Sequence, residues 1–316
     1  MATTSSIGTS GRDYSTPQAW WDAFATGGWI GECYNDSEFT ATAQTTFSGK
    51  ATSATDYATL KCAAGQSFSD NANVRSNALR YNAANGVGMR KTNSYSYTLN
   101  VDNSYVTISG IQITAGTNTY PLSLSMGRTN MVLEYSIVEQ RAAAHAIYAD
   151  GSGKTRNCLI VNRSASSSGI HSSYGTWTHR NLVIVRPSDV AATESAFNGG
   201  GTADIKNCAG FGFTNFSSTA SGKSGSNNCS DATISFGTSN QASKTYASQF
   251  EVTTDATRDF RAKAGADLLN NGVTDTTNVP AGDDISRLAR PQGSAWDIGP
   301  WELSVSAQQM LGMMVL

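Results

Sequence analysis

The stretch Thr176-Trp-Thr-His-Arg-Asn-Leu-Val-Ile184 is one copy of a pattern of alternating apolar residues that recurs along the chain. Four other segments can be laid over it: Tyr105-Val-Thr-Ile-Ser-Gly-Ile-Gln-Ile113, Asn130-Met-Val-Leu-Glu-Tyr-Ser-Ile-Val138, Ser152-Gly-Lys-Thr-Arg-Asn-Cys-Leu-Ile160 and Thr202-Ala-Asp-Ile-Lys-Asn-Cys-Ala-Gly210. Their shared reference positions are Gly110, Tyr135, Asn157, Asn181 and Asn207. A repeat of about two dozen residues indicates a solenoid, in which each repeat forms one coil.

The reference position marks a bend in each coil. On both sides of it, apolar residues occupy alternate positions, which is the period of a β-strand. The alternation slips by one residue at the reference, so the backbone turns there while both strands still point inward. Asparagine tolerates the left-handed conformation that such a turn needs. Stacked about 4.8 Å apart on successive coils, Asn157, Asn181 and Asn207 are predicted to hydrogen-bond along the solenoid.

A further strand is predicted in each coil, in segments 121–126, 145–149, 168–172 and 194–198. Three strands per coil predict an all-β fold, a right-handed parallel β-helix. A β-sandwich with coincidental spacing is the alternative, because sandwiches also place short strands at regular intervals.

The chain divides into four regions that differ in the regularity of the repeat and in composition. We expect residues 1–100 to form an N-terminal cap and first irregular coils, and residues 101–232 the regular coils. Residues 233–303 are expected to form C-terminal coils or a cap, and residues 304–316 an apolar docking tail. In the first region, Thr16 suits a helix N-cap and Pro17 the first helical position. The short helix that follows carries Trp20 and Phe24 on one face, so we expect it to plug the open end of the solenoid. A sugar-binding aromatic surface is the alternative role for this helix.

The tail is too short to cross a membrane. Its apolar side chains are expected to dock on another subunit, and packing along its own solenoid is the alternative. The docking residues are Met310, Leu311, Met313, Met314, Val315 and Leu316.

Composition excludes several classes of function. Charged residues make up 15% of the chain and the formal net charge is −2, without the basic stripe of a nucleic-acid-binding protein. No apolar run is long enough to span a bilayer, and residues 1–15 lack the basic and apolar regions of a secretion signal. The five cysteines have no zinc or disulfide spacing, and we expect them to be buried free thiols. These features predict folding in a cytoplasm, without membrane or nucleic-acid partners.

The coils and the C-terminal region resemble a known class of protein. The Asn-Cys style of coil, the stretch Asp259-Phe-Arg-Ala-Lys-Ala-Gly-Ala-Asp267 and the ending Asp297-Ile-Gly-Pro-Trp-Glu302 resemble right-handed parallel β-helix repeat proteins of bacteria and their phages. The opening Gly11-Arg-Asp-Tyr-Ser-Thr16 looks like phage-encoded members. The resemblance implies the fold, whereas the class includes lyases, hydrolases, adhesins and virion proteins.

Catalytic residues are not evident in the coils. A glycoside hydrolase needs two carboxylates that flank the bond, and a lyase needs a base with a neutralising cation. The acidic residues do not fall at equivalent points of adjacent coils: Glu134, Glu139, Asp150, Asp189, Glu194 and Asp204. Asp283 and Asp284 are expected in a solvent-exposed loop. The sequence therefore predicts no catalytic, cofactor or metal site.

The three histidines are interpreted as structural. His179 falls at an inward position beside Trp177 and is expected to be buried. His145 and His171 fall near the third strand of successive coils, in different registers, so a shared site stays open.

Two functions remain. The first is a structural virion protein of a bacteriophage, such as a capsid-decoration or tail-associated β-helix. It would be assembled in the host cytoplasm as a homo-oligomer, with a trimer as the expected form, and bind capsid or tail subunits. The alternative is a polysaccharide-binding or polysaccharide-degrading β-helix, such as a tailspike depolymerase, with Tyr148 and Tyr174 lining a groove for a host-surface glycan.

Overall fold

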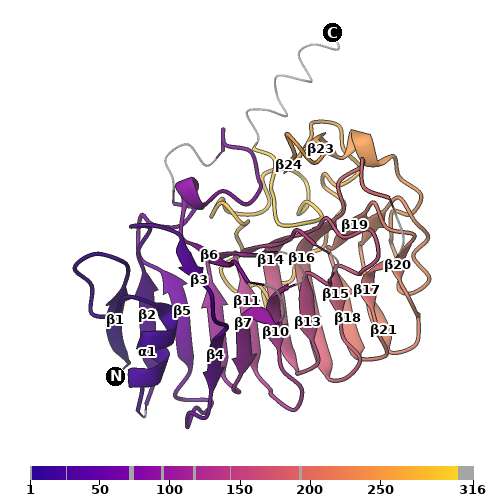
Figure 1. Ribbon diagram of the computed structural model, residues 1–316. Coiled ribbons are helices and arrows are strands. Elements are labelled where there is room, and N and C mark those ends of the chain that lie inside the picture. The colour runs from indigo at the N-terminus through magenta and orange to yellow at the C-terminus, as the bar shows by residue number, and fades with distance from the viewer. Residues whose placement is uncertain are drawn as a thin grey trace.

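The structure is a computed structural model that describes residues 2–25, 27–70, 75–93, 96–116, 119–142, 144–191 and 194–304. Within these ranges the chain winds into a parallel β-helix whose coils stack along one axis (Figure 1). The strands form three faces that run along the stack, so the predicted fold class is confirmed. The β-sandwich alternative is wrong, because neighbouring coils pair in parallel, as β14 and β16 do, whereas a sandwich is built from antiparallel strands.

Among the described residues, the first face consists of β1 (Thr3–Ile7), β2 (Trp29–Cys33), β5 (Ala58–Cys62), β8 (Val106–Ser109), β11 (Met131–Glu134), the first parts of β14 (Gly153–Asn162) and β16 (Thr176–Val185), β18 (Thr202–Lys206) and β21 (Lys223–Ser226). The second face consists of β3 (Phe39–Ala41), β6 (Gly88–Lys91), β9 (Gln112–Ala115), β12 (Ile137–Gln140), the second parts of β14 and β16, β19 (Ala209–Phe211) and β22 (Cys229–Ser230). The third face is a separate sheet of β4 (Thr45–Ser48), β7 (Tyr97–Asp102), β10 (Tyr120–Leu124), β13 (Ile147–Ala149), β15 (Ile170–His171), β17 (Ser195–Asn198) and β20 (Asn215–Ser217).

The bend between the first and second faces falls at the predicted reference residues. All five have a positive φ: 75° at Gly110, 48° at Tyr135, 50° at Asn157, 52° at Asn181 and 55° at Asn207. Strands β14 and β16 run through the bend without interruption. The left-handed residue is therefore what turns the strand from one face to the next.

The interior of the solenoid is a column of inward side chains in register. Ile108, Leu133, Thr155, His179 and Ile205 pair in sequence across five coils. His179 is buried, as predicted, and its Nδ1 lies 2.6 Å from the Thr155 hydroxyl. The two polar groups satisfy each other, which removes most of the cost of burying them in an apolar column. Burial lowers the pKa of His179 to about 3, so the ring is neutral at neutral pH.

The predicted helix is α1 (Pro17–Ala23), and it packs against the first strands of the solenoid. The Thr16 hydroxyl accepts the Ala19 N–H at 3.1 Å, and Pro17 occupies the first turn. Trp21 stacks on Phe47 of β4, with ring centroids 4.5 Å apart. The helix therefore plugs the N-terminal end, and its aromatic rings are too deeply buried to form the alternative sugar-binding surface.

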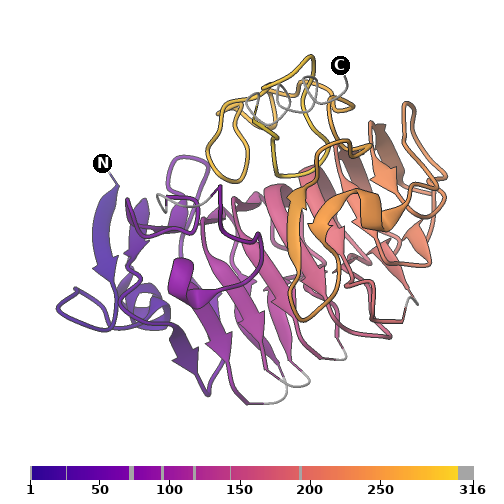
Figure 2. The same cartoon turned by 90° about the horizontal axis from the view of Figure 1, so that it is seen from above.

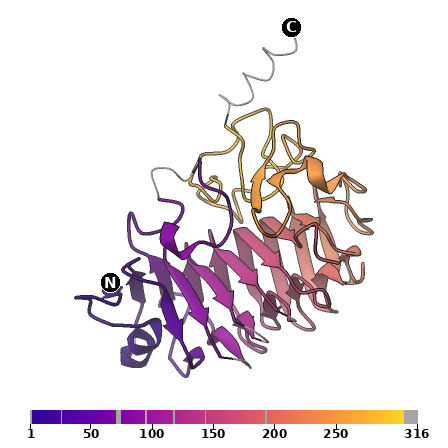
Figure 3. The ribbon, with the colours of Figure 1, turned by 45° about the horizontal axis from the view of Figure 1, so that its top comes forward.

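A second apolar core lies outside the solenoid. The outward side chains of the second face, including Leu159, Val161, Val183 and Val185, pack against Phe250, Phe260 and other residues from distant parts of the chain. These parts include the hairpin β23 (Phe250–Val252) and β24 (Asp259–Ala262), the 3₁₀ turns at Ala83–Asn85 and Tyr246–Ser248, and the irregular segment to Glu302. We call residues 250–302 the C-terminal segment, and Figures 2 and 3 show it lying over the solenoid.

The C-terminal segment is held by polar contacts as well. Tyr135 donates its hydroxyl to Asp283 at 2.6 Å, and Arg156 donates to the Asn278 carbonyl at 2.8 Å. Asp284 is fully buried and pairs with Arg75 at 2.9 Å. The expectation of a solvent-exposed loop at Asp283 and Asp284 is therefore wrong, because this loop fastens the segment to the coils.

Candidate functional site

The three asparagines of the bend form a hydrogen-bonded row along the solenoid. Asn181 donates its side-chain amide to Asn157 Oδ1 at 3.0 Å, and Asn207 donates to Asn181 Oδ1 at 3.1 Å. At the two ends of the row, Asn157 donates to the Asp283 carbonyl and Asn207 to the Val273 carbonyl, at 3.0 and 2.7 Å. All three are fully buried. The row joins the coils to one another and to the C-terminal segment, and it is not accessible to a ligand.

The third face carries a cluster of aromatic rings on its outer side. We call Tyr97, Tyr120, His145, Tyr148 and His171 the aromatic platform. Its rings come from β7, β10, β13 and β15 and from the residue two positions before β13. Inward and outward positions alternate along a strand, so the buried Ile147 and Ile170 place their neighbours Tyr148 and His171 on the outer surface. Ring contacts join the other three rings to these two. All five side chains are partly exposed.

The platform is continuous across four adjacent strands. Tyr97 pairs with Tyr120, and their ring centroids are 5.3 Å apart. Tyr148 lies 6.0 Å from Tyr120 and stacks on His171 at 5.3 Å, with 19° between the planes. His171 in turn stacks on His145 at 4.5 Å. The coil repeat therefore converts residues that are far apart in sequence into a strip parallel to the solenoid axis.

Polar groups hold the rings in place. The Tyr148 hydroxyl is hydrogen-bonded to Asp150, and this contact and burial raise the pKa of Tyr148 to about 12. Asp150 also accepts the Ser173 backbone N–H at 2.7 Å. His171 Nε2 lies 2.9 Å from the Ser173 hydroxyl. Ser123 is covered by the surrounding structure and hydrogen-bonds to Tyr97. Such contacts restrict the rotamers of the rings, which makes the surface preorganised.

One of the two platform histidines, His145, is neutral at neutral pH. His145 Nδ1 accepts the Ser168 backbone N–H at 3.0 Å, which places the ring proton on Nε2. Burial and the neighbouring His171 lower the pKa of His145 to about 4. The structure thus brings His145 and His171 together, whereas the sequence left open whether they share a site.

Sequence reasoning identified only part of this surface. Tyr148 belongs to the platform, whereas Tyr174 stands in the turn after β15, 60% exposed and apart from the ring cluster. Tyr97 and Tyr120 were missed. Their separation of about one coil period is the signal that could have found them, since residues one period apart lie side by side on a solenoid.

Most carboxylates that the sequence singled out have structural partners. Glu139 is fully buried between Arg141 and Arg258, each at 2.7 Å. Asp204 pairs with the buried Arg180. Asp189 accepts the Asp255 N–H at 2.9 Å. These contacts fasten loops and the C-terminal segment to the coils.

The remaining predictions concern metals, thiols and the tail. In the part of the chain that the structure describes, no three His, Cys, Asp or Glu side chains are arranged to hold a metal ion. No helix among the same residues has the length and apolar character that crossing a bilayer requires. The five cysteines are free thiols, and four of them are buried. The docking residues from Met310 to Leu316 lie outside the described residues, so the docking role stays a prediction.

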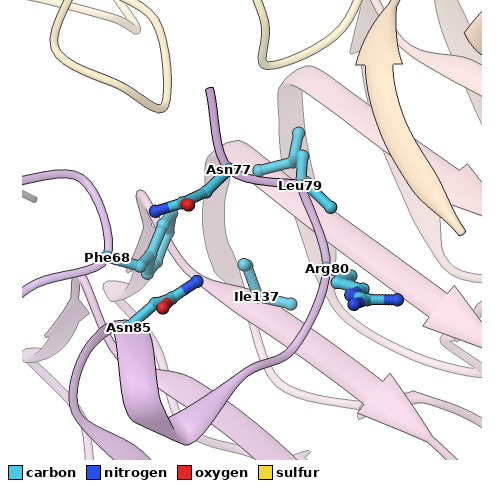
Figure 4. Close-up of a pocket in the computed structure, with 7 residues that line it drawn as sticks. Phe68, Asn77, Leu79, Arg80, Asn85 and Ile137 are labelled. Carbon is cyan, nitrogen blue, oxygen red and sulfur yellow. The ribbon is translucent and has the colours of Figure 1, made fainter. Parts of the chain in front are cut away.

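A pocket opens beside the second face, under the loop that precedes β6 (Figure 4). Its lining includes Phe68, Leu79 and Ile137, with Asn77, Arg80 and Asn85 at its edges. Phe68, Leu79 and Ile137 belong to the outer apolar core. We interpret the pocket as a packing gap in that core, because three of its walls are core side chains.

Comparisons with known proteins were made by sequence and by structure. No protein-family model matches the chain, and no curated protein matches it. The crystal structure of pectate lyase Pel9A is similar with a TM-score of 0.51 and 14% identity, over 95% of this chain and 96% of that one. The pectin methylesterase from Aspergillus niger gives a TM-score of 0.47 and 16% identity, over 88% of this chain and 94% of that one.

These comparisons lend no support to the bacteriophage and virion role, which stays a prediction together with its partners and location. At such low identity the likeness is informative about architecture only. The chain folds as a right-handed parallel β-helix like that of pectate lyase Pel9A.

Proposed function

We propose that this protein binds a polysaccharide along the aromatic platform. The observation that carries the proposal is the strip of five partly exposed rings contributed by four adjacent strands. Aromatic faces pack against the C–H faces of sugar rings, and preorganised rings lose little entropy on binding. The coil spacing of about 4.8 Å is close to the length of one pyranose unit, so successive coils can meet successive sugars.

Polar groups beside the rings supply the complementary contacts. Asn100, Ser123, Tyr148, His171 and Asn198 lie in one register row across the third face. The partly exposed amides of Asn100 and Asn198 in this row can donate to and accept from sugar hydroxyls, whereas Ser123 is buried. The similar solved structure is that of a pectate lyase, and polysaccharide binding by this chain is consistent with that likeness. The proposal itself rests on the platform.

Substitution of the rings tests the proposal. A panel of immobilised glycans first identifies a ligand, and affinity electrophoresis then measures binding by variants. Tyr148→Ala is expected to weaken binding about tenfold, because it removes a ring from the centre of the strip. Tyr174→Ala is the matched control, since it removes an exposed tyrosine that stands apart from the cluster. Equal binding by Tyr148→Ala and the wild type would refute the proposal.

A further inference from the structure

The charges around the aromatic platform are distributed unevenly. Asp150 lies at its centre, directly beside Tyr148, and is 4% exposed. Burial raises the pKa of Tyr97, and the neighbouring Tyr120 and the Asp150 carboxylate raise it further. The electrostatic environment that acts on these tyrosines is thus negative.

Carboxylates also occur at both ends of the register row. At one end Asp102 follows Asn100 by two positions and therefore faces the same side of β7. At the other end the Asn198 amide donates to the Glu194 carboxylate at 3.2 Å. A ligand that extends along the platform would pass near Asp150 and Glu194, and at its other end near Asp102, which is paired with Arg128.

Two basic side chains of this region, Arg128 and Lys91, are engaged by other groups. Arg128 donates to Asp102 at 2.7 Å and forms an ion pair with it. Lys91, which precedes β7, is 4% exposed, and its ammonium group donates to the Ser96 hydroxyl at 2.6 Å. Recognition of a polymer's carboxylates or sulfates needs guanidinium or ammonium groups that face the ligand. Neither of these two groups has that position.

We infer that the aromatic platform selects neutral polysaccharides and rejects anionic ones, an inference that rests on the proposed function. A neutral sugar can stack on the rings without bringing a charge near Asp150. A polyuronate would instead bring its own carboxylates close to Asp150, where like charges repel. Asp150 is therefore the residue that discriminates between the two classes of polymer.

Matched polymers test this inference without a known natural ligand. One pair is polygalacturonate and its fully methyl-esterified form, and the other is carboxymethylcellulose and hydroxyethylcellulose. Within each pair the backbone is shared and the charge differs. We expect the neutral member to bind at least about fivefold more tightly at low ionic strength, with the ratio approaching one in high salt. Affinity electrophoresis and calorimetry measure the ratio.

Variants assign the selection to Asp150. Asp150→Asn is expected to reduce the preference for the neutral polymer about fivefold, whereas Glu251→Gln, an exposed position on β23, is the control and should leave it unchanged. Circular dichroism checks that Asp150→Asn is folded. Preferential binding of the anionic member, with loss of binding in Tyr148→Ala, would overturn the inference and retain the proposed function. Failure of the wild type to bind any polymer in these pairs or in the glycan panel would overturn both.

Discussion

Replacement of Asn181 tests how much the buried row of asparagines contributes to stability. Asn181→Ala removes the donor to Asn157 Oδ1 and the acceptor of the Asn207 amide. The Asn207 amide keeps its hydrogen bond to the Val273 carbonyl. The larger loss of stability therefore comes from Asn157, whose fully buried Oδ1 loses the Asn181 donor. A buried polar atom without its partner costs about 1–3 kcal/mol. Alanine at a φ of 52° adds about 1 kcal/mol of backbone strain.

The expected loss for Asn181→Ala is therefore about 3 kcal/mol in the free energy of unfolding. Asn181→Gly removes the same hydrogen bonds but accepts the left-handed backbone, so it should be milder by about 1 kcal/mol. Asn130→Ala is a matched control, because Asn130 is exposed and has a φ of 56° without belonging to the row. The free energy of unfolding of Asn130→Ala should be about 1 kcal/mol lower than that of the wild type.

Equilibrium unfolding in urea, followed by tryptophan fluorescence and circular dichroism, measures these differences. The reasoning fails if Asn181→Ala is no less stable than Asn130→Ala. It also fails if glycine at position 181 is as destabilising as alanine, since the backbone would then contribute nothing.

Three further predictions concern the two cores and the buried ionisable groups. Leu159→Ala should cost about 2–5 kcal/mol in urea unfolding, because this outward side chain is fully buried; a loss near zero would mean that the second face is open to solvent. Arg290→Met should lower the thermal stability by about 3–5 kcal/mol, because it leaves the buried Glu302, 3.2 Å away, without its cation; an unchanged melting temperature would contradict this. The free energy of unfolding should decline as the pH falls from about 6.5 toward 3, because His179 binds a proton in the unfolded chain but not in the folded one, where its pKa is about 3. His179→Phe should reduce this pH dependence by about 1.4 kcal/mol per pH unit. An identical slope in the variant and the wild type would exclude the assignment to His179.

The coil could be predicted from sequence because its signal is local and periodic. Alternation on either side of Asn157 and Asn181, with a slip of one residue at the asparagine, describes two strands and the bend between them. The short helix was also predictable, since Thr16 and Pro17 are sufficient to indicate where it starts. Each of these features depends on residues within one turn or one coil of each other.

The cover over the second face could not be predicted, although part of its signal was present. In Cys158-Leu-Ile-Val161 the apolar residues are continuous, which is typical of a strand that is buried on both sides. What covers such a strand depends on contacts like that of Asn157 with Asp283, between a periodic coil and an irregular segment. Such long-range pairs leave no regular pattern in the sequence.

The platform was predictable only in part, for a related reason. Its histidines and Tyr148 lie near short third-face strands, and β15 contains two residues, so the register between neighbouring coils could not be read from alternation. Tyr97 lies before the regular repeat region and therefore had no aligned segment to place it beside Tyr120.

The apolar cover has a consequence for biosynthesis. The ribosome makes the coils before the segment from Phe250 to Glu302, so the nascent coils expose much of the outward side of their second face until that segment has been made. An exposed apolar sheet surface is a site of aggregation. The coils therefore cannot mature one by one as independent repeats do. Emergence of the segment from Phe250 to Glu302 becomes the step that covers this apolar surface.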